Sequence, residues 1–466
     1  MKISLPLRHL LPILLIVVPL FLTVVHGQQA PICRDAQECR ELALDAAMRG
    51  EYERFHDLAW RAVQTGPKND STLMYLLARA QVLSGRPHDA LVMLKRLADM
   101  RVATDAASDP DFERTRALPG WPEVAAATAD VGKATPPPRA AAARGGSGAS
   151  TAGPRTPAAA PNATAGVPPV AGAFPVEAVS SSEAVRFSTG QFLAAGLAYD
   201  AVSRRFVIGD GLGRKLIVVG DGADHADVLV RGESAGFNDV IALAIDELRG
   251  NLWVVGASVT SGESALHRLQ LVSGRSLKSY GSAPSVGSTQ LVDLAVQVSG
   301  DVIALDSFGN RLLRLPSAGS EMILALSLKV SGARSVAARN DNLIFIAHDA
   351  GIARVDLRSG AVTALSVPKG FDLGRFDTIR AHSDGLIGLQ TTPAGSRQLV
   401  RLTLNAAGRA VTKGTVIDPQ VAEIGGHVSV SITGNELYYL ATDGADAGAP
   451  SSNREVPFVV RHLTLR

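Results

Sequence analysis

The sequence has few of the residues on which nucleic-acid-binding and ring-stacking proteins rely. Phe, Trp and Tyr make up only 5% of its 466 residues, which leaves few candidates for platforms on which bases or other rings stack. It also lacks an excess of one charge, because 46 Lys and Arg residues stand against 44 Asp and Glu residues and the two kinds are interspersed. A polyanion-binding face requires clustered basic side chains. We therefore expect no nucleic-acid partner.

Cysteine is nearly absent. The two cysteines, Cys33 and Cys39, lie six residues apart near the N-terminus, and too few further Cys or His residues lie nearby for a zinc site. In an oxidising compartment this spacing can close a small loop over the start of the first helix. The alternative is a pair of thiols, so the sequence leaves a Cys33–Cys39 disulfide as one of two possibilities.

Long apolar runs are missing after the N-terminal segment, so we expect no transmembrane segment beyond it. The run from Leu10 to Val25 follows Lys2 and Arg8 and precedes small residues ending at Gly27, which is the layout of a secretory signal peptide. We expect residues 1–27 to be removed and the protein to be periplasmic or extracellular. The alternative is an uncleaved anchor, since the run falls just short of the roughly 17 to 25 residues that span a bilayer.

After the signal, apolar positions follow helical spacing, and two stretches align with each other at a period of about 35 residues. Small side chains at Ala43, Ala78 and Ala90 stand where close packing of helices requires them. The pattern resembles tetratricopeptide repeats, except that Phe55 takes a position where that family carries a small residue. We predict a helical domain over residues 28–130. A third, degenerate unit is expected near its end, because two repeats alone bury little core.

Residues 131–173 consist largely of Ala, Pro, Gly, Ser and Thr. Such a stretch cannot offset its loss of conformational entropy by burying apolar surface, so we predict a disordered linker. Because few contacts would cross it, we expect the segments on either side to fold independently.

Residues 174–466 consist of short apolar runs separated by Gly, Asp and Asn. A strand, turn, strand, turn, strand unit recurs six times, at spacings of roughly 41 to 51 residues. This period and strand count indicate a β-propeller of about six blades. To close the ring, one end of the propeller must pair with the other, and either the strand predicted over residues 456–463 or the stretch near Val185 can do so. The predicted fold class is multidomain, with a short helical-hairpin repeat domain followed by an all-β propeller.

Two of these units resemble the sequence repeat of a known family. The stretches from Leu291 to Leu312 and from Asn238 to Trp253 resemble the repeat of NHL and gluconolactonase (regucalcin)-like propellers. That resemblance implies a divalent cation such as Ca²⁺ in the central channel, held by oxygen donors where innermost strands begin. The matching positions are Asn238, Asp239, Asp293 and Asp377, with His427 in an equivalent place of a later blade. The family's first-blade glutamate has no counterpart except Glu183, whose surroundings differ from the motif. Alternatively, these side chains cap turns.

Two short motifs suggest other chemistry. The sequence from Gly232 to Gly236 has the spacing of a hydrolase nucleophile elbow, but the segment after it is predicted to be a strand rather than the helix that the elbow requires. His348 and Asp349 could be a base and its orienting acid. Adjacent residues of a strand point to opposite faces, however, so a pair on a turn is the better interpretation.

Taken together, these patterns favour an exported binding or scaffold protein rather than an enzyme. The helical repeats or a propeller face would bind a protein or a small ligand. The alternative is a metal-dependent lactone hydrolase of the gluconolactonase type, in which a cation polarises the carbonyl and activates water.

Overall fold

The computed structural model describes residues 33–133, 174–177, 181–190, 192–419, 421, 430–442 and 456–465. The predicted signal peptide, nearly all of the predicted linker and His427 lie outside these residues. Among the helices that the structure describes, none is long and apolar enough to cross a membrane.

The N-terminal part is a helical module. Its elements are α1 (Ala36–Met48), α2 (Tyr52–Thr65), α3 (Ser71–Leu83), α4 (Pro87–Asp99), the 3-10 turn η1 (Pro110–Phe112), α5 (Glu113–Arg116) and α6 (Trp121–Lys133). The side chains of Asp35 and Asp70 accept hydrogen bonds from backbone N–H groups in the first turns of α1 and α3, which satisfies donors that a helix start leaves open. Antiparallel helix pairs are confirmed, while tetratricopeptide repeats remain a resemblance.

A disulfide joins Cys33 to Cys39, with their Cα atoms 5.1 Å apart. After α4 the module continues with η1, α5 and α6, where the sequence predicts a third, degenerate unit. Phe112 is fully buried in the module core, and Asp111 of η1 accepts a hydrogen bond of 2.9 Å from Arg79 Nε of α3. Through these contacts the third unit covers part of α3.

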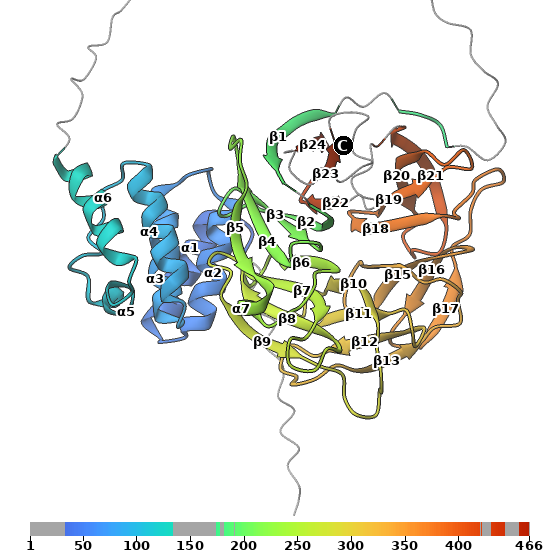
Figure 1. Cartoon of the computed structure of the whole chain (residues 1–466), viewed down its shortest axis with the longest axis horizontal. Coiled ribbons are helices and arrows are strands. Elements are labelled where there is room, and N and C mark those ends of the chain that lie inside the picture. Colours follow the sequence, from blue (N-terminus) through green and yellow to red (C-terminus); the bar gives the residue numbers. More distant parts are fainter. Residues whose placement is uncertain are drawn as a thin grey trace, which may run out of the picture.

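The C-terminal part is a six-bladed propeller in which every blade has four strands. Figure 1 shows the blades arranged in a ring. The first three blades are β2–β5 (Ala194–Asp200, Arg205–Asp210, Lys215–Gly220, Asp227–Arg231), β6–β9 (Ala242–Asp246, Asn251–Ala257, Ser264–Gln270, Ser276–Tyr280) and β10–β13 (Leu291–Val296, Val302–Asp306, Arg311–Leu315, Ile323–Ser327). Blades four and five are β14–β17 (Ser335–Ala338, Leu343–His348, Gly351–Asp356, Ala361–Ala364) and β18–β21 (Phe376–His382, Gly385–Thr391, Arg397–Leu404, Val411–Asp418).

The sixth blade closes the ring. It contains β22 (Val430–Thr433), β23 (Glu436–Thr442), β24 (Val456–Thr464) and, as its outermost strand, β1 (Ser182–Thr189). Phe187 of β1 lies opposite Phe458 of β24, and the two strands run antiparallel. Both stretches predicted as candidates for ring closure therefore take part, because they pair with each other.

The second strand of each blade explains why the sequence shows a periodic apolar signal. Every residue of β11 is buried, whereas the outermost strand β13 of the same blade is largely exposed. A second strand lies between the sheets of neighbouring blades, so both of its faces are covered and it reads as an unbroken apolar run. The six copies of this run are the six repeats visible in the sequence.

The strands of each blade are antiparallel, so the loops fall on two faces. We call the face at which each innermost strand begins the front face, which also carries the loop between the second and third strands. The back face carries the loops between the first and second strands and between the third and fourth.

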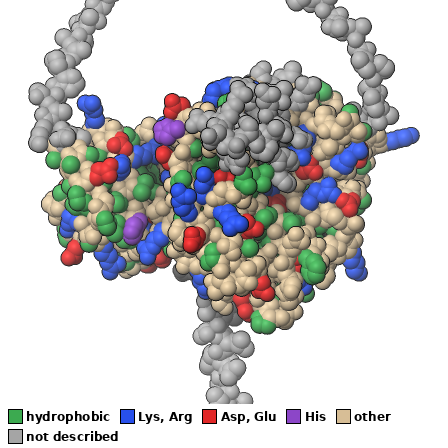
Figure 2. Space-filling model, in the orientation of Figure 1, with side chains coloured by type: hydrophobic (Ala, Val, Ile, Leu, Met, Phe, Trp, Pro, Cys, Tyr) green, Lys and Arg blue, Asp and Glu red, His purple; other side chains and the backbone are tan. Residues whose placement is uncertain are grey.

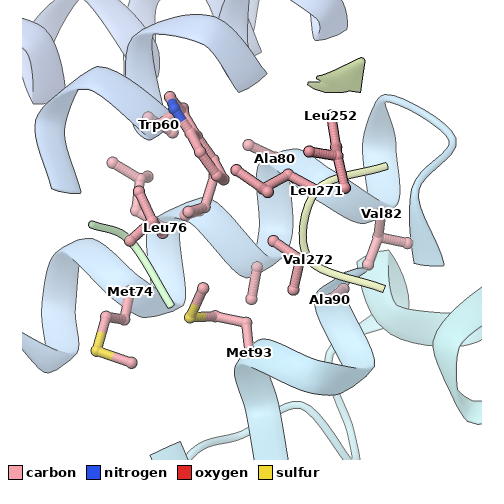
Figure 3. Close-up of a cluster of buried hydrophobic side chains, with 14 of the residues drawn as sticks. Trp60, Met74, Leu76, Ala80, Val82, Ala90, Met93, Leu252, Leu271 and Val272 are labelled. Carbon is pink, nitrogen blue, oxygen red and sulfur yellow. The ribbon is translucent and has the colours of Figure 1, made fainter. Parts of the chain in front are cut away.

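The helical module lies beside blades one and two in Figure 1, and its contacts are with their back-face loops. Trp60 Nε1 of α2 donates a 2.7 Å hydrogen bond to the Glu247 carbonyl, and Arg96 Nη1 of α4 donates one of 2.6 Å to the Val202 carbonyl. One continuous apolar cluster joins Trp60, Leu76 and Met93 of the module to Leu252, Leu271 and Val272 of the propeller (Figure 3). The expectation of few contacts between the two parts is therefore wrong.

After the predicted linker, the chain attaches to the outer edge of blade five. Val416 of β21 donates to the Pro175 carbonyl at 2.9 Å, and Glu177 donates to the Val416 carbonyl at 2.9 Å. The Phe174 ring stacks on Phe371, with ring centroids 4.9 Å apart. The helical module and the segment at Phe174 are therefore held by separate sets of contacts, the first on blades one and two and the second on blade five.

Candidate functional site

The strongest predicted metal ligand, Asp293, lies buried near the start of β10. Its Oδ1 accepts a 2.9 Å hydrogen bond from the Leu294 N–H, and its Oδ2 accepts bonds of 2.6 Å from Ser335 Oγ and 3.0 Å from the Val336 N–H. Ser335 begins β14 and also accepts a 3.1 Å bond from the Ile379 N–H of β18. One carboxylate thus links the innermost strands of blades three, four and five.

A side chain of the protein supplies the positive charge at Asp293. Arg380 of β18 donates to both carboxylate oxygens, from Nη1 at 3.0 Å and from Nη2 at 3.3 Å. A two-point guanidinium–carboxylate pair is among the stronger polar contacts in proteins. Because both oxygens of Asp293 accept donors from the protein itself, the donor set does not fit a cation held by this carboxylate.

The other three predicted ligands have separate partners. Asn238 Nδ2 donates to the Ser258 carbonyl at 3.4 Å, and Asp239 Oδ1 accepts from the Ala257 N–H. Asp377 Oδ2 accepts a 2.8 Å bond from Thr391 Oγ1.

The structure does not gather the predicted ligands around one point. Among the described residues, no group of three or more His, Cys, Asp or Glu side chains could hold a metal ion. Glu183 lies on β1, the outermost strand of blade six, where it pairs with Arg186 at 2.6 Å. The hydrogen bonds and ion pairs of these predicted ligands agree better with the alternative interpretation, in which they stabilise turns and contacts between blades, than with a metal site.

A polar cluster instead occupies the front face of blades four and five. Arg334 forms an ion pair with Asp349, which also accepts a 3.0 Å bond from Ser331 Oγ. Asp377 lies between two guanidinium groups, 3.9 Å from Arg334 Nη1 and 3.8 Å from Arg397 Nε. The charges alternate from blade four to blade five, so this cluster can form ion pairs and hydrogen bonds with the polar part of a partner.

His348 lies beside this cluster, at the end of β15. Burial lowers its pKa, Asp349 opposes that effect and Arg334 adds to it. The imidazole is therefore neutral at neutral pH, and its Nδ1 accepts a 3.3 Å hydrogen bond from the Ala350 N–H. Asp349 bonds to Ser331 and Arg334, as described above, so the two adjacent side chains have different partners.

The nucleophile-elbow motif forms a single helical turn, α7 (Gly232–Ala235), between blades one and two. Ser234 Oγ donates to the Arg231 carbonyl at 2.9 Å. This hydroxyl closes a local turn, which accounts for the serine without a catalytic role.

Exposed apolar side chains recur on the front face of blades one, two and three. Leu212, Val259 and Phe308 stand on the loops between the second and third strands of these blades and are 55%, 41% and 73% exposed. Ile241, just before β6, is 44% exposed. We call these four residues the apolar front loops. Exposed apolar side chains that form one patch often mark a site at which another molecule binds.

Sequence reasoning missed both front-face features. Arg334 and Arg397 look like ordinary surface residues in the sequence, and only the fold places them beside Asp377. Phe308 did carry a signal, because the turn Asp306–Asn310 holds an aromatic residue where polar and small residues are usual.

Charge on the remaining surface is mixed. Basic and acidic side chains are interspersed over the face shown in Figure 2. The balance of charges in the sequence thus carries over to this face.

No family model matches the chain, and no curated protein is similar to it. Several solved structures match it at low identity. A PQQ-bound aldose sugar dehydrogenase from Streptomyces coelicolor is 12% identical, with a TM-score of 0.41 over 63% of this chain and 99% of the other. A gluconolactonase from Xanthomonas campestris is 16% identical, with a TM-score of 0.41 over 64% of this chain and 99% of the other. A streptogramin B lyase is 13% identical, with a TM-score of 0.39 over 61% and 90%. At these values the likeness carries no inference about activity.

Proposed function

We propose that this chain is an exported binding protein that holds a protein partner on the front face of its propeller. The apolar front loops are the observation that supports this proposal. They lie on three successive blades, on the face opposite the one that the helical module covers. A partner that buries them would gain free energy from the removal of apolar surface from water.

The polar cluster of blades four and five completes the proposed binding surface. Interfaces between proteins combine apolar contacts with a polar rim that fixes orientation. Arg334, Asp349 and Asp377 would supply such a rim on the side of the channel away from the apolar front loops. The lactone-hydrolase alternative has no comparable support, since Asp293 is paired with Arg380.

A photocrosslinking residue in place of Phe308 tests this surface in cells that make the protein. We expect a discrete crosslinked adduct, because this side chain is the most exposed of the four. The matched control is the same residue in place of Val298, which is 56% exposed but lies on a back-face turn. Substituting Leu212→Ser and Val259→Ser should reduce the Phe308 adduct at least about tenfold, as expected when apolar anchors are lost. Equal adducts at positions 298 and 308 would contradict the proposal.

Export is part of the proposal and has its own test. We expect the purified mature chain to begin at Gln28 and to contain the Cys33–Cys39 disulfide only when it is made in an oxidising compartment. N-terminal sequencing and intact mass measured with and without reductant check both statements. A chain that retains Met1 in the membrane fraction would replace the cleaved signal with an anchor.

A further inference from the structure

The contact between the helical module and the propeller contains a buried acid without a counter-charge of its own. Asp89 of α4 is 3% exposed, and its Oδ1 has no hydrogen-bond partner in the described part of the chain. Across the contact, Ser273 on the turn between β8 and β9 hydrogen-bonds to this carboxyl group from its backbone and its side chain, and Arg205 of β3 lies nearby. A buried carboxylate that is not paired strongly disfavours its charged form.

The two arginines that face Asp89 are already paired with other acids. Arg86, at the start of α4, forms a 2.8 Å ion pair with Glu53 of α2. Arg205 lies 3.5 Å from Asp200 and donates hydrogen bonds to the carbonyls of Leu271 and Val272. Neither guanidinium is therefore available to Asp89 alone.

We propose that the helical module docks reversibly on the propeller and that proton binding at Asp89 closes this joint. The joint is well suited to separate from the rest of the fold. It is held by one apolar cluster and by bonds to back-face carbonyls such as those of Glu247 and Val202, and no strand pairing crosses it in the described part of the chain.

The direction of the pH effect follows from the carboxyl group. Burial raises the pKa of Asp89 to about 6 from its ordinary 3.8, and Ser273, Arg86 and Arg205 lower it by less. When the module leaves the propeller, water returns to the carboxylate and the pKa falls toward its ordinary value. The docked form therefore binds the proton more tightly, and docking weakens as the pH rises from about 4 through about 6. Acidification closes the joint.

One neighbouring group acts in the opposite direction. Burial, with a smaller contribution from Arg275, lowers the pKa of His88. Its protonation at acidic pH therefore opposes docking. His56, buried beside Trp60 inside the module, also has a pKa lowered by burial. The contribution of Asp89 must consequently be measured as a difference between variants.

The indole N–H of Trp60 reports docking in the full-length protein, because its hydrogen bond to Glu247 breaks when the module leaves. Its hydrogen-exchange protection, taken relative to free indole at the same pH, is measured by NMR. We expect Asp89→Asn to raise this protection. The ratio of the Trp60 protection factor in the variant to that in the unaltered protein should fall about tenfold from pH 7.5 to pH 5. The control is Asp99→Asn, an exposed acid on the same helix, whose ratio should stay near one.

Two further measurements make the outcome decisive. Trp253, buried in blade two, reports opening of the propeller, and equal protection of its indole and that of Trp60 would show that the module leaves only on global unfolding. That result would overturn the proposal, as would a ratio of the two Trp60 protection factors that does not change with pH.

The second measurement uses His88→Gln, which keeps Asp89 and removes the opposing histidine. Trp60 protection should therefore rise about tenfold on acidification in this variant. A flat response there would also overturn the proposal.

Discussion

Replacing Asp293 with Asn should lower the free energy of unfolding of the propeller by about 3 kcal/mol or more, because it leaves the Arg380 guanidinium on the innermost strand of blade five without its counter-charge. The Asn side chain keeps the shape of Asp but also points an amide N–H₂ at donors of the protein. Urea unfolding followed by circular dichroism measures the loss. Arg380→Met should cost a similar amount, since it leaves a buried carboxylate. The double variant should lose less than the sum of the two, as expected for partners in one contact.

A second predicted ligand, Asp377, provides the matched control. Its carboxylate is partly exposed, and its arginine neighbours are 3.8 and 3.9 Å away. Asp377→Asn should therefore change stability by less than about 1 kcal/mol. An Asp293→Asn protein as stable as the unaltered one, together with a melting temperature of the unaltered protein that rises with calcium, would restore the metal hypothesis.

Replacing Trp60 with Ala should undock and destabilise the helical module by about 3 to 5 kcal/mol, which is the usual cost of removing a large buried ring. The substitution removes both the ring from the apolar cluster and the hydrogen bond to Glu247. Limited proteolysis should then cut the module well before the propeller. Met48→Ala on α1 is the control, because Met48 is 81% exposed and its loss should matter little.

The same contact can be tested from the propeller side. A Cβ at Gly250 would lie 3.1 Å from Cζ3 of Trp60, and the backbone there has a φ of +61° that disfavours side chains. Gly250→Ala should therefore also make the module more sensitive to protease. If both substitutions left the module as resistant as in the unaltered protein, the packing of Trp60 against the propeller would not be what holds it.

The propeller was predictable from the sequence because each blade repeats a strand that is covered on both faces. Runs such as Val302–Leu305 are apolar throughout, and their regular recurrence gives both the blade count and the architecture. Closure of the ring was also predictable, since a propeller must pair its two ends and only a few stretches were available.

The partners of individual side chains were not predictable in this way. Asp293 and Arg380 are 87 residues apart, and they meet only because the innermost strands of blades three, four and five lie next to one another. In the sequence alone, an aspartate at the start of a strand is equally consistent with a metal ligand, a turn cap or one partner of an ion pair. Periodicity alone cannot choose among them.

The contact between module and propeller was hidden for a different reason. Trp60 occupies an ordinary apolar position of a helix, and its partner Glu247 is 187 residues away. The composition of residues 131–173 predicts only that this segment has no core of its own. It gives no information about the surfaces of the two parts that the segment connects. Leu271 and Val272 could have indicated this contact in the sequence. Two adjacent apolar residues at the start of a turn are expected to be buried by another part of the protein.

The separate anchoring of the helical module and of the segment at Phe174 has a consequence for how this protein can evolve. The helical module is positioned by its packing against blades one and two, and the propeller receives the chain at blade five. The geometry of the two parts is therefore set by contacts among the described residues. Exposed positions outside these contacts, such as Met48, are free to vary without changing it. Substitutions at Trp60 or Gly250, by contrast, would need compensation on the other side of the contact.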